Sequence, residues 1–166
     1  MREWVPVSTS AKGRLVLAAV RAFGAQSYDS VSVGDLAAEA EVTTGALYHH
    51  FGSKLELYEF VRRDVEQRLI DRMEGAASTL ADGDSIGVVL GIGFDFAVRM
   101  SFQRILGDPP HADGDVLVEF LDRLVSPAAP PLGRVLAAAW RAAVLATTDA
   151  GDVDAARAAL SALQLR

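Results

Sequence analysis

Three closely spaced helix-start signals constrain this chain more than any other feature of its sequence. Ser32 followed three residues later by Asp35 has the form of a capping box, so we expect a helix to begin at Val33. Thr43 can cap a second helix, and a further capping box at Ser53 predicts the start of a third, longer helix. Only about three residues separate the first two helices, so they must cross at a steep angle. This arrangement is a helix-turn-helix, whose second helix can enter the major groove of DNA.

The residues exposed on this motif fit a contact with DNA. Those at the start of the second helix are small, so its N-terminus can approach base edges and phosphates closely. Tyr48 and His49 lie one turn further on and are long enough to reach the sugar–phosphate backbone, and Lys54 adds a positive charge. Leu47 and Phe51 are spaced to pack inward. The predicted DNA-binding residues are Ser32, Val33, Thr43, Thr44, Gly45, Ala46, Tyr48, His49 and Lys54.

A pattern of small, apolar and aromatic positions runs through the same residues. It comprises Val33, Leu36, Ala37, Ala40, Val42, Gly45, Leu47, Tyr48, His50, Phe51, Ser53, Lys54 and Leu57, with Phe23 and Tyr28 upstream. This pattern closely resembles the N-terminal DNA-binding domain of TetR-family transcriptional regulators. The resemblance implies an all-α fold, in which an N-terminal three-helix head with the helix-turn-helix is joined by a long helix to a C-terminal helical domain for ligand binding and dimerisation.

Three positions depart from the family pattern. Glu41 stands in the turn where the family usually has glycine, and a non-glycine residue in the left-handed conformation costs about 1–2 kcal/mol. Ser27 replaces a glycine just before Tyr28, and Thr44 replaces a basic residue that often follows the cap of the second helix. The missing charge predicts fewer phosphate contacts and a shallower salt dependence of DNA binding.

The charge of the chain limits how it can bind DNA. The net charge is −6, which argues against a nonspecific nucleic-acid coat. Residues 1–56 hold five basic and six acidic residues, a net charge of −1, and residues 57–166 hold 11 basic and 16 acidic residues, a net charge of −5. The predicted head is therefore not basic. DNA binding has to rest on a few well-placed contacts, on helix N-termini and on the avidity of a dimer.

The rest of the sequence predicts further helices and two domains. We expect a DNA-binding domain at residues 1–56 and a helical ligand-binding and dimerisation domain at residues 57–166, with His111 in a loop. In the long helix, apolar residues recur at every fourth position as one buried stripe, formed by Leu57, Val61, Val65, Leu69 and Met73. The helices predicted outside the helix-turn-helix span residues 10–26, 53–75, 84–106, 115–125, 132–148 and 152–164.

The central helix of the second domain is apolar nearly all round, which is typical of a buried helix. Its glycines Gly87, Gly91 and Gly93 either allow close helix packing or leave room for a ligand. Asp95 and Arg99, spaced i and i+4, form either a structural ion pair or the polar contacts of a ligand pocket. For the aromatic candidates the alternative is an ordinary core. The candidate pocket residues are Phe94, Asp95, Phe96, Arg99, Met100, Phe102, Phe120 and Trp140.

The last two predicted helices, residues 132–148 and 152–164, are rich in alanine. We expect them to pair with the same helices of a second copy in a four-helix bundle, as TetR-family members commonly do. The alternative is an intramolecular hairpin that completes the core. A small, largely apolar effector in the second domain is expected to tilt the long helix and release the DNA, so that effector and operator oppose each other.

Several other classes of protein do not fit this sequence. The chain has no cysteine, which excludes disulfides, thiolate metal sites and cysteine nucleophiles and fits a cytoplasmic location. His49 and His50 are adjacent, so on a helix they point about 100° apart and cannot bind one metal ion from one face. The most apolar stretch, residues 86–98, is too short to span a membrane. Since catalytic motifs are absent too, we expect no enzyme activity, metal or cofactor.

These features together indicate a homodimeric, ligand-responsive repressor that binds a near-palindromic operator in double-stranded DNA. The alternative is a ligand-binding or partner-binding helical dimer whose DNA-binding head is degenerate. Glu41, Thr44 and the missing positive charge support this alternative. Binding to the DNA upstream of the chain's own gene distinguishes the two hypotheses.

Overall fold

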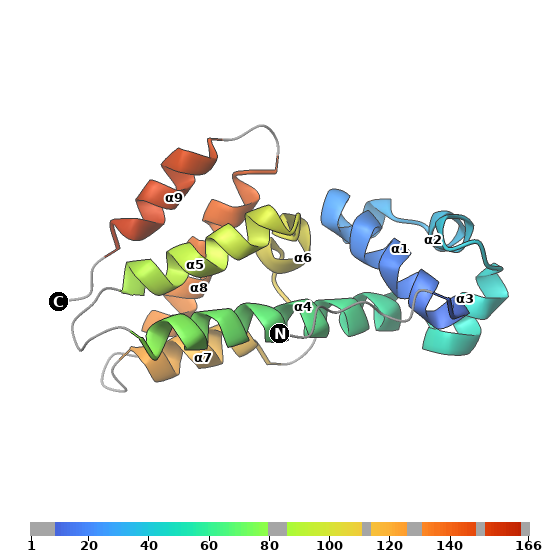
Figure 1. Ribbon diagram of the computed structural model, residues 1–166, viewed down its shortest axis with the longest axis horizontal. Coiled ribbons are helices and arrows are strands. Elements are labelled where there is room, and N and C mark those ends of the chain that lie inside the picture. The colour runs from blue at the N-terminus through green and yellow to red at the C-terminus, as the bar shows by residue number, and fades with distance from the viewer. Residues whose placement is uncertain (1–8, 80–85, 111–113, 126–130, 149–151, 164–166) are drawn as a thin grey trace. The chain divides into compact units, whose positions relative to one another are not determined.

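The described part of the chain is built of helices joined by loops. Its described residues form helices and loops without strands (Figure 1), which confirms the predicted all-α fold. None of the helices in this part of the chain is long and apolar enough to cross a membrane. His111 and the predicted helix-end residues 84, 85 and 164 lie outside the described part. The computed structural model describes residues 9–79, 86–110, 114–125, 131–148 and 152–163.

Two compact units make up the chain, Met1–Asp64 (unit 1) and Val65–Arg166 (unit 2). The boundary lies within helix α4, which contributes residues to both units, whereas the sequence places it between residues 56 and 57, near the start of the same helix. Unit 1 contains α1 (Ala11–Ala25), the 3₁₀ helix η1 (Tyr28–Ser30), α2 (Val33–Glu39), α3 (Thr44–Phe51) and the first part of α4 (Lys54–Ala77). Unit 2 contains the rest of α4, α5 (Ile86–Arg99), α6 (Gln103–Gly107), α7 (Val116–Leu124), α8 (Leu132–Leu145) and α9 (Val153–Ser161).

Side-chain caps start the helices of unit 1 where the sequence predicts them. In each cap a hydroxyl oxygen accepts a hydrogen bond from the backbone N–H three residues later, which satisfies one of the N–H groups that a helix leaves without a partner. As a result, α2 begins at Val33, α3 at Thr44 and α4 at Lys54. The caps are Ser32 with Asp35 at 3.0 Å, Thr43 with Ala46 at 3.2 Å and Ser53 with Glu56 at 3.1 Å.

The core of unit 1 lies where α1, α2, α3 and the start of α4 meet. Leu15, Leu36 and Leu47 are fully buried, each from a different one of the first three helices. The ring of Phe23 packs edge-on against the ring of Tyr58, with their centroids 4.9 Å apart. Burial of each such side chain stabilises the fold by about 1.5–3 kcal/mol. This core holds α2 and α3 in the crossed arrangement of the helix-turn-helix.

The apolar stripe predicted on the long helix is confirmed. Its five residues, one per helical turn, are at most 2% exposed, from Leu57 to Met73. In unit 2 the stripe packs closely against α5, because a Cβ on Gly93 would lie only 2.8 Å from the Met73 sulfur. Because Gly93 has no side chain, α4 and α5 can approach each other closely. At this glycine the structure agrees with the hypothesis of close helix packing.

The single central helix predicted at residues 84–106 is wrong. The helix α5 ends at Arg99, and α6 begins only at Gln103. Between them Ser101 has a φ of +58°, and the N–H of Phe102 donates to the Ala97 carbonyl oxygen at 2.8 Å. The break redirects the chain so that α6 packs against α8. No glycine or proline marks this break, which is why the sequence pattern continued across it.

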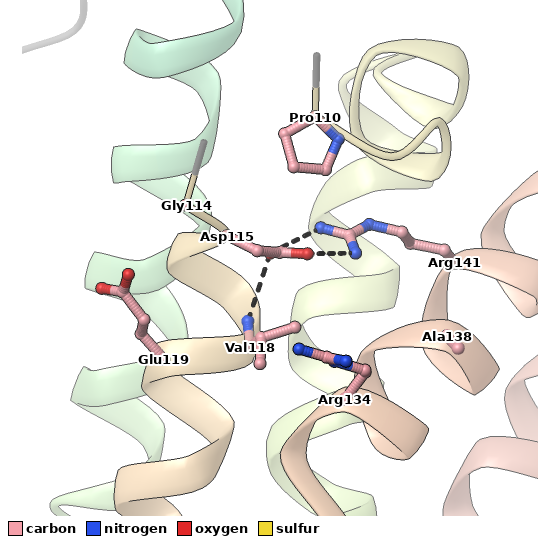
Figure 2. A pocket seen from close by; sticks show the side chains of 8 residues that line it. All are labelled: Pro110, Gly114, Asp115, Val118, Glu119, Arg134, Ala138 and Arg141. Carbon is pink, nitrogen blue, oxygen red and sulfur yellow. Dashed lines mark hydrogen bonds and ion pairs between the residues drawn. The ribbon is translucent and has the colours of Figure 1, made fainter. Parts of the chain in front are cut away.

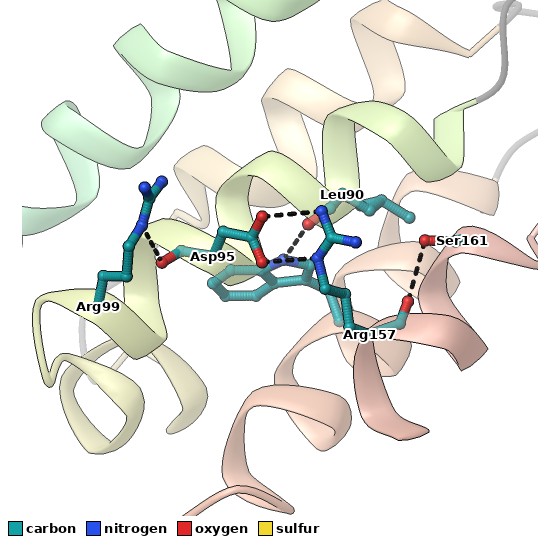
Figure 3. Close-up of polar contacts among 6 residues, drawn as sticks. Leu90, Asp95, Arg99, Arg157 and Ser161 are labelled. Carbon is teal, nitrogen blue, oxygen red and sulfur yellow. Dashed lines mark hydrogen bonds and ion pairs between the residues drawn. The ribbon is translucent and has the colours of Figure 1, made fainter. Parts of the chain in front are cut away.

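The predicted ion pair between Asp95 and Arg99 is also wrong. The Asp95 carboxylate accepts two hydrogen bonds from Arg157 of α9, at 2.8 and 2.9 Å (Figure 3). Arg99 instead donates its Nε–H to the backbone carbonyl oxygen of Asp95 at 3.2 Å. A guanidinium fork matches a carboxylate in this two-bond geometry, so Arg157 takes the partner that the i, i+4 spacing assigned to Arg99. The pair connects α5 to α9.

Two further contacts hold the C-terminal helices on α5. The buried Trp140 of α8 donates its indole N–H to the Leu90 carbonyl oxygen at 3.0 Å. At the start of α5, a Cβ on Gly87 would lie 2.9 Å from the Ser161 carbonyl oxygen, so this glycine also serves close packing. Gly91 differs, since a Cβ there would meet only the Ser161 Oγ, at 3.9 Å. Docking of α9 thus depends on an ion pair and on one glycine.

Alanine at Gly87 and at Gly91 is expected to change stability in opposite directions. At Gly91 the added methyl group has room, and the higher helix propensity of alanine stabilises the fold by about 1 kcal/mol. At Gly87 the methyl group has to displace backbone carbonyls at the end of α9, which costs about 1–3 kcal/mol. Thermal unfolding followed by circular dichroism measures both. A Gly87→Ala variant as stable as Gly91→Ala would contradict close docking of α9.

Candidate nucleic-acid interface

The helix α3 presents one face to solvent and one to the core. Thr43, Thr44 and Gly45 at its start are exposed, and Tyr48 is 53% exposed one turn further on. On the opposite side Leu47 and Phe51 are buried in unit 1, which confirms their predicted inward packing. The uncharged, hydrogen-bonding face of α3 is therefore open to a partner.

Two histidines extend this exposed face toward the C-terminus of α3. His49, a predicted contact residue, and His50, which the prediction left out, are both exposed, and their ring centroids lie 5.2 Å apart. Either ring can donate a hydrogen bond to a phosphate oxygen. In the sequence, His50 was assigned only to the family pattern, because helical spacing alone does not say how far a helix is covered by its neighbours.

The start of α2 supplies the remaining predicted contacts. Ser32 is exposed, Val33 is partly exposed, and the Ser32 hydroxyl donates to the Asp35 carboxylate at 2.6 Å while it accepts from the Asp35 N–H. The hydroxyl hydrogen is therefore engaged within the capping box. What α2 offers to a phosphate is its N-terminal backbone N–H groups and the positive end of the helix dipole.

The turn between α2 and α3 has the left-handed conformation that glycine usually adopts. Glu41 has a φ of +52°, and its N–H donates to the Ala38 carbonyl oxygen at 3.1 Å. The N–H of Val42 donates to the Ala37 carbonyl oxygen at 2.9 Å. These bonds close the end of α2 in the way typical of a helix C-terminus. The family geometry is kept although the glycine is not, so the turn stores conformational strain.

Two lysines of unit 1 contact the protein itself. The Lys54 ammonium donates to the carbonyl oxygens of Tyr28 and Val31, at 3.0 Å each, so it caps backbone groups before α2. Lys12 lies over the rings of Phe51 and Phe60, at 5.5 and 5.4 Å from their centroids.

Two arginines of α1 are engaged in the same way. Arg14 donates its Nε–H to the Ala40 carbonyl oxygen at 2.8 Å. Arg21 forms an exposed ion pair with Glu39, with 3.5 Å between Nη1 and Oε1. Sequence reasoning missed the role of Arg14, since no pattern in the sequence links a residue of α1 to the end of α2.

In unit 2, the candidate pocket residues fall into a buried group and a more exposed group. Phe94, Phe96, Phe102, Phe120 and Trp140 are each at most 6% exposed and belong to the core. Of the others, Asp95 is bound by Arg157, and Arg99 and Met100 are exposed. As ligand contacts these residues stay a prediction.

A pocket of about 520 Å³ lies elsewhere in unit 2, between α7 and α8 (Figure 2). On its wall Arg141 donates to both carboxylate oxygens of Asp115, at 2.6 and 2.8 Å, and the Nε of Arg141 is buried with no hydrogen-bond partner among the described residues. The pocket is lined by Pro110, Gly114, Asp115, Val118, Glu119, Arg134, Ala138 and Arg141. Asp115 and Arg141 are 26 residues apart in the sequence, so helical spacing gave no signal for this pair.

The Asp115 carboxyl is held in its charged form. Partial burial by itself raises its pKa, but the hydrogen bonds and the charge of Arg141 outweigh this effect. The N–H groups of Leu117 and Val118 also donate to the carboxylate, since Asp115 is the N-cap of α7. The resulting pKa of Asp115 is below its ordinary value. Asp115 thus starts α7 and binds it to α8.

Comparison with known proteins finds a family match in the N-terminal part of this chain. Residues 15–61 match the family described as bacterial regulatory proteins, tetR family. The HTH-type transcriptional activator FasR of Mycolicibacterium smegmatis is 34% identical over 71 residues, and the match spans 43% of this chain and 32% of FasR. The chain thus covers about a third of the length of this relative.

Two solved structures share the fold. A TetR-like transcriptional regulator from Rhodococcus sp. has a TM-score of 0.66 at 21% identity, with 91% of each chain covered. A TetR-family transcriptional regulator from Pectobacterium atrosepticum has a TM-score of 0.65 at 24% identity, with 93% of this chain and 90% of the other covered. At these identities the likeness concerns the fold alone.

An all-α chain whose N-terminal unit exposes one face of a helix-turn-helix falls in the class of helix-turn-helix regulators. Within this class, residues 15–61 match the tetR family of bacterial regulatory proteins, and the rest of the described chain shares the fold of TetR-like structures. This family consists of DNA-binding regulators of transcription and not of enzymes.

Replacing Glu41 by glycine is expected to stabilise unit 1. Glycine adopts the left-handed conformation without the side-chain penalty, so we expect the free energy of unfolding to rise by about 1 kcal/mol. The matched control is Ala38→Gly, at an exposed position inside α2, which is expected to lower it by about 1 kcal/mol. Denaturant unfolding followed by circular dichroism measures both. A Glu41→Gly variant less stable than the wild type would show that the turn is not strained.

Proposed function

We propose that this chain is a homodimeric transcriptional repressor that binds a near-palindromic operator and responds to a small effector. The observation that carries the proposal is the exposed, uncharged face of α3 on a rigid helix-turn-helix core. The two copies of α3 in a dimer enter successive major grooves on one side of the duplex. The DNA target places the protein in the cytoplasm.

Several of the predicted contacts keep a role in this proposal. Thr44 and Gly45 are small and exposed at the start of α3, so they approach base edges and read sequence. Tyr48 and His49 lie where they donate hydrogen bonds to phosphates, which fixes the position of the head without reading sequence. The start of α2 binds a further phosphate through its N–H groups.

The surface of α8 and α9 supports a dimer. Val135 of α8 is 57% exposed, Val153 of α9 is 36% exposed, and Leu160 is the one described residue of α9 that is fully buried. Within the chain α9 packs on α5 and α8, as in the hairpin alternative, but this packing leaves apolar groups on the outer faces of both helices. Association with a second copy removes these groups from water.

The proposed effector binds in unit 2 and acts through α4, the helix that belongs to both units. The predicted apolar walls are packed in the core, so a small apolar effector has to rearrange them in order to bind. The pocket between α7 and α8 is already open, and its volume of about 520 Å³ lies within the usual range of ligand sites. Coupling is reciprocal, so an effector that releases DNA binds less tightly to the DNA complex.

Repression is the sign of regulation we propose, because a dimer bound over a promoter excludes the polymerase without any further contact. FasR, whose match spans 43% of this chain, is named an activator. Transcription in vitro from the chain's own promoter determines the sign. Fewer transcripts on addition of the protein support repression, and more transcripts overturn it.

The alternative function is a ligand-binding or partner-binding dimer with a degenerate head. One observation favours it: Lys54, Arg14, Lys12 and Arg21 are all engaged by groups of the protein. A head of this kind binds DNA weakly and without sequence preference. DNA binding therefore decides between the two functions.

The deciding experiment is fluorescence anisotropy on labelled duplex from upstream of the chain's own gene, at two salt concentrations. Random duplex of equal length is the control. Saturable binding with two protomers per site, tighter than on random DNA, supports the regulator. Binding no tighter than on random DNA, there and on fragments selected from the whole genome, supports the degenerate head.

Two variants of α3 are expected to separate sequence reading from phosphate binding. Tyr48→Phe removes a hydroxyl donor, so we expect affinity to fall by a similar factor, about three- to tenfold, on operator and on random DNA. Thr44→Ala is expected to change the ranking of operator variants, with about tenfold effects at single base pairs. Anisotropy titrations on operator, single-base variants and random duplex measure both. Equal losses on all DNA for both variants would contradict this division of roles.

A charge on the outer face of α8 is expected to break the dimer. Val135→Glu places a carboxylate where the proposed partner helix packs, so we expect the dimer dissociation constant to rise at least about a hundredfold. Val116→Glu, at a 43% exposed valine of α7, is the matched control and is expected to leave the dimer intact. Analytical ultracentrifugation measures both. A Val135→Glu protein that stays dimeric would place the interface elsewhere.

A further inference from the structure

In unit 1, α2 is held at both ends by basic side chains that come from other helices. At its start, Lys54 of α4 donates to the carbonyl oxygens of Tyr28 and Val31, which precede the Ser32 cap. At its end, Arg14 of α1 donates to the carbonyl oxygen of Ala40. Both basic side chains are partly buried. We refer to Lys54 and Arg14 as the α2 clamp.

A cation stabilises a helix most at its C-terminal end, and Arg14 lies at this end of α2. The last carbonyls of a helix lack partners within the helix and carry the negative end of its dipole, so a guanidinium there is favourable. The Arg14 Nε–H reaches the Ala40 oxygen at 2.8 Å, and Nη1 also donates to Thr9 at 3.1 Å. The next residue is Glu41, in the strained left-handed conformation. Arg14 therefore holds the backbone directly before the turn.

The start of α2 is, by contrast, an unfavourable place for a cation, because it is the positive end of the helix dipole. Lys54 is nevertheless drawn there by two carbonyl oxygens at 3.0 Å and by the Tyr28 ring, whose centroid lies 4.0 Å from its ammonium. Two of its three N–H donors are engaged by the protein. The geometry thus assigns this charge to the backbone before α2.

We propose that Lys54 and Arg14 are positioning residues of the helix-turn-helix, which fix α2 and the turn and thereby the angle of α3, and that neither neutralises a DNA phosphate. This inference deepens the proposed function, because its consequence for DNA rests on operator binding by α3. It replaces the sequence-based role of Lys54 as a charge beside the DNA. It also explains how the turn retains its family geometry with Glu41 in place of glycine.

The salt dependence of binding distinguishes a positioning residue from a phosphate contact. Each neutralised phosphate contributes about 0.9 to the slope of log K against log salt concentration. Loss of a phosphate contact therefore lowers affinity and reduces the slope by about one. Loss of a positioning residue lowers affinity for the operator and leaves the slope unchanged.

The experiment compares Lys54→Gln and Arg14→Gln with the wild type on labelled duplex from upstream of the chain's own gene. We expect operator affinity to fall at least about tenfold with an unchanged salt slope, because each substitution removes charge-assisted hydrogen bonds that hold α2. Arg63→Gln, at an exposed arginine of α4, is the control and is expected to change neither quantity. A slope reduced by about one in Lys54→Gln would overturn the proposal, as would unchanged affinity.

Amide hydrogen exchange tests the clamp without DNA. In both clamp variants we expect faster exchange in α2 and the turn at residues 40–43, and wild-type exchange in the fully buried part of α1. Unchanged exchange in α2 would overturn the clamp whatever the DNA result. If the wild-type protein shows no preference for operator DNA, the proposed function fails, and the exchange data still decide on the clamp.

A second substitution tests whether Arg14→Gln acts through the strained turn or through misfolding of the whole unit. The added substitution Glu41→Gly relieves the strained turn that Arg14 holds, so the double variant is expected to recover most of the lost exchange protection in α2. Lys54→Arg, which keeps the charge and the donors, is expected to recover part of the operator affinity that Lys54→Gln loses. Failure of both to restore anything would show that the two side chains act only through general stability.

Discussion

The backbone groups left without partners at helix ends are the constraint on which this structure depends. Short helices have few internal hydrogen bonds, so each unsatisfied end costs a large share of their stability. In unit 1 hydroxyl caps satisfy the starts of α2, α3 and α4, and basic side chains satisfy the carbonyls on either side of α2. In unit 2 the same task falls to Asp115 and Asp152.

Use of the basic side chains for this purpose has a consequence for DNA recognition. In the proposed function, unit 1 meets DNA with neutral donors, two histidines and helix N-termini, since most of its described cations are bound to carbonyls, rings or a carboxylate. Neutral hydrogen-bonding groups give less long-range attraction than charges do, and they depend more on correct orientation. A rigid helix-turn-helix is therefore more important here than in a strongly basic head.

Unit 2 is held together by close packing and by ion pairs between distant helices. Gly87 and Gly93 allow α5 to approach α9 and α4, and Asp95 and Asp115 bind arginines of α9 and α8. The ion pair of α9 is partly exposed and thus contributes little to stability, whereas its glycine contact depends on shape. A second copy of the chain packed on the outer face of α9 would add to these contacts.

Local features of the sequence determined the helix starts and the apolar stripe of α4, because capping and periodicity act between residues a few positions apart. The family resemblance marked position 41 as one where glycine is usual, and Glu41 has a φ of +52° there. Only the tertiary structure decided the break at Ser101, the partner of Asp95, the pocket beside Arg141 and the inward direction of Lys54. The partners of Lys54, Arg141 and Asp95 lie between 23 and 62 residues away along the chain, and each competes with groups nearer in the sequence. Spacing along the chain carries no information about such a competitor.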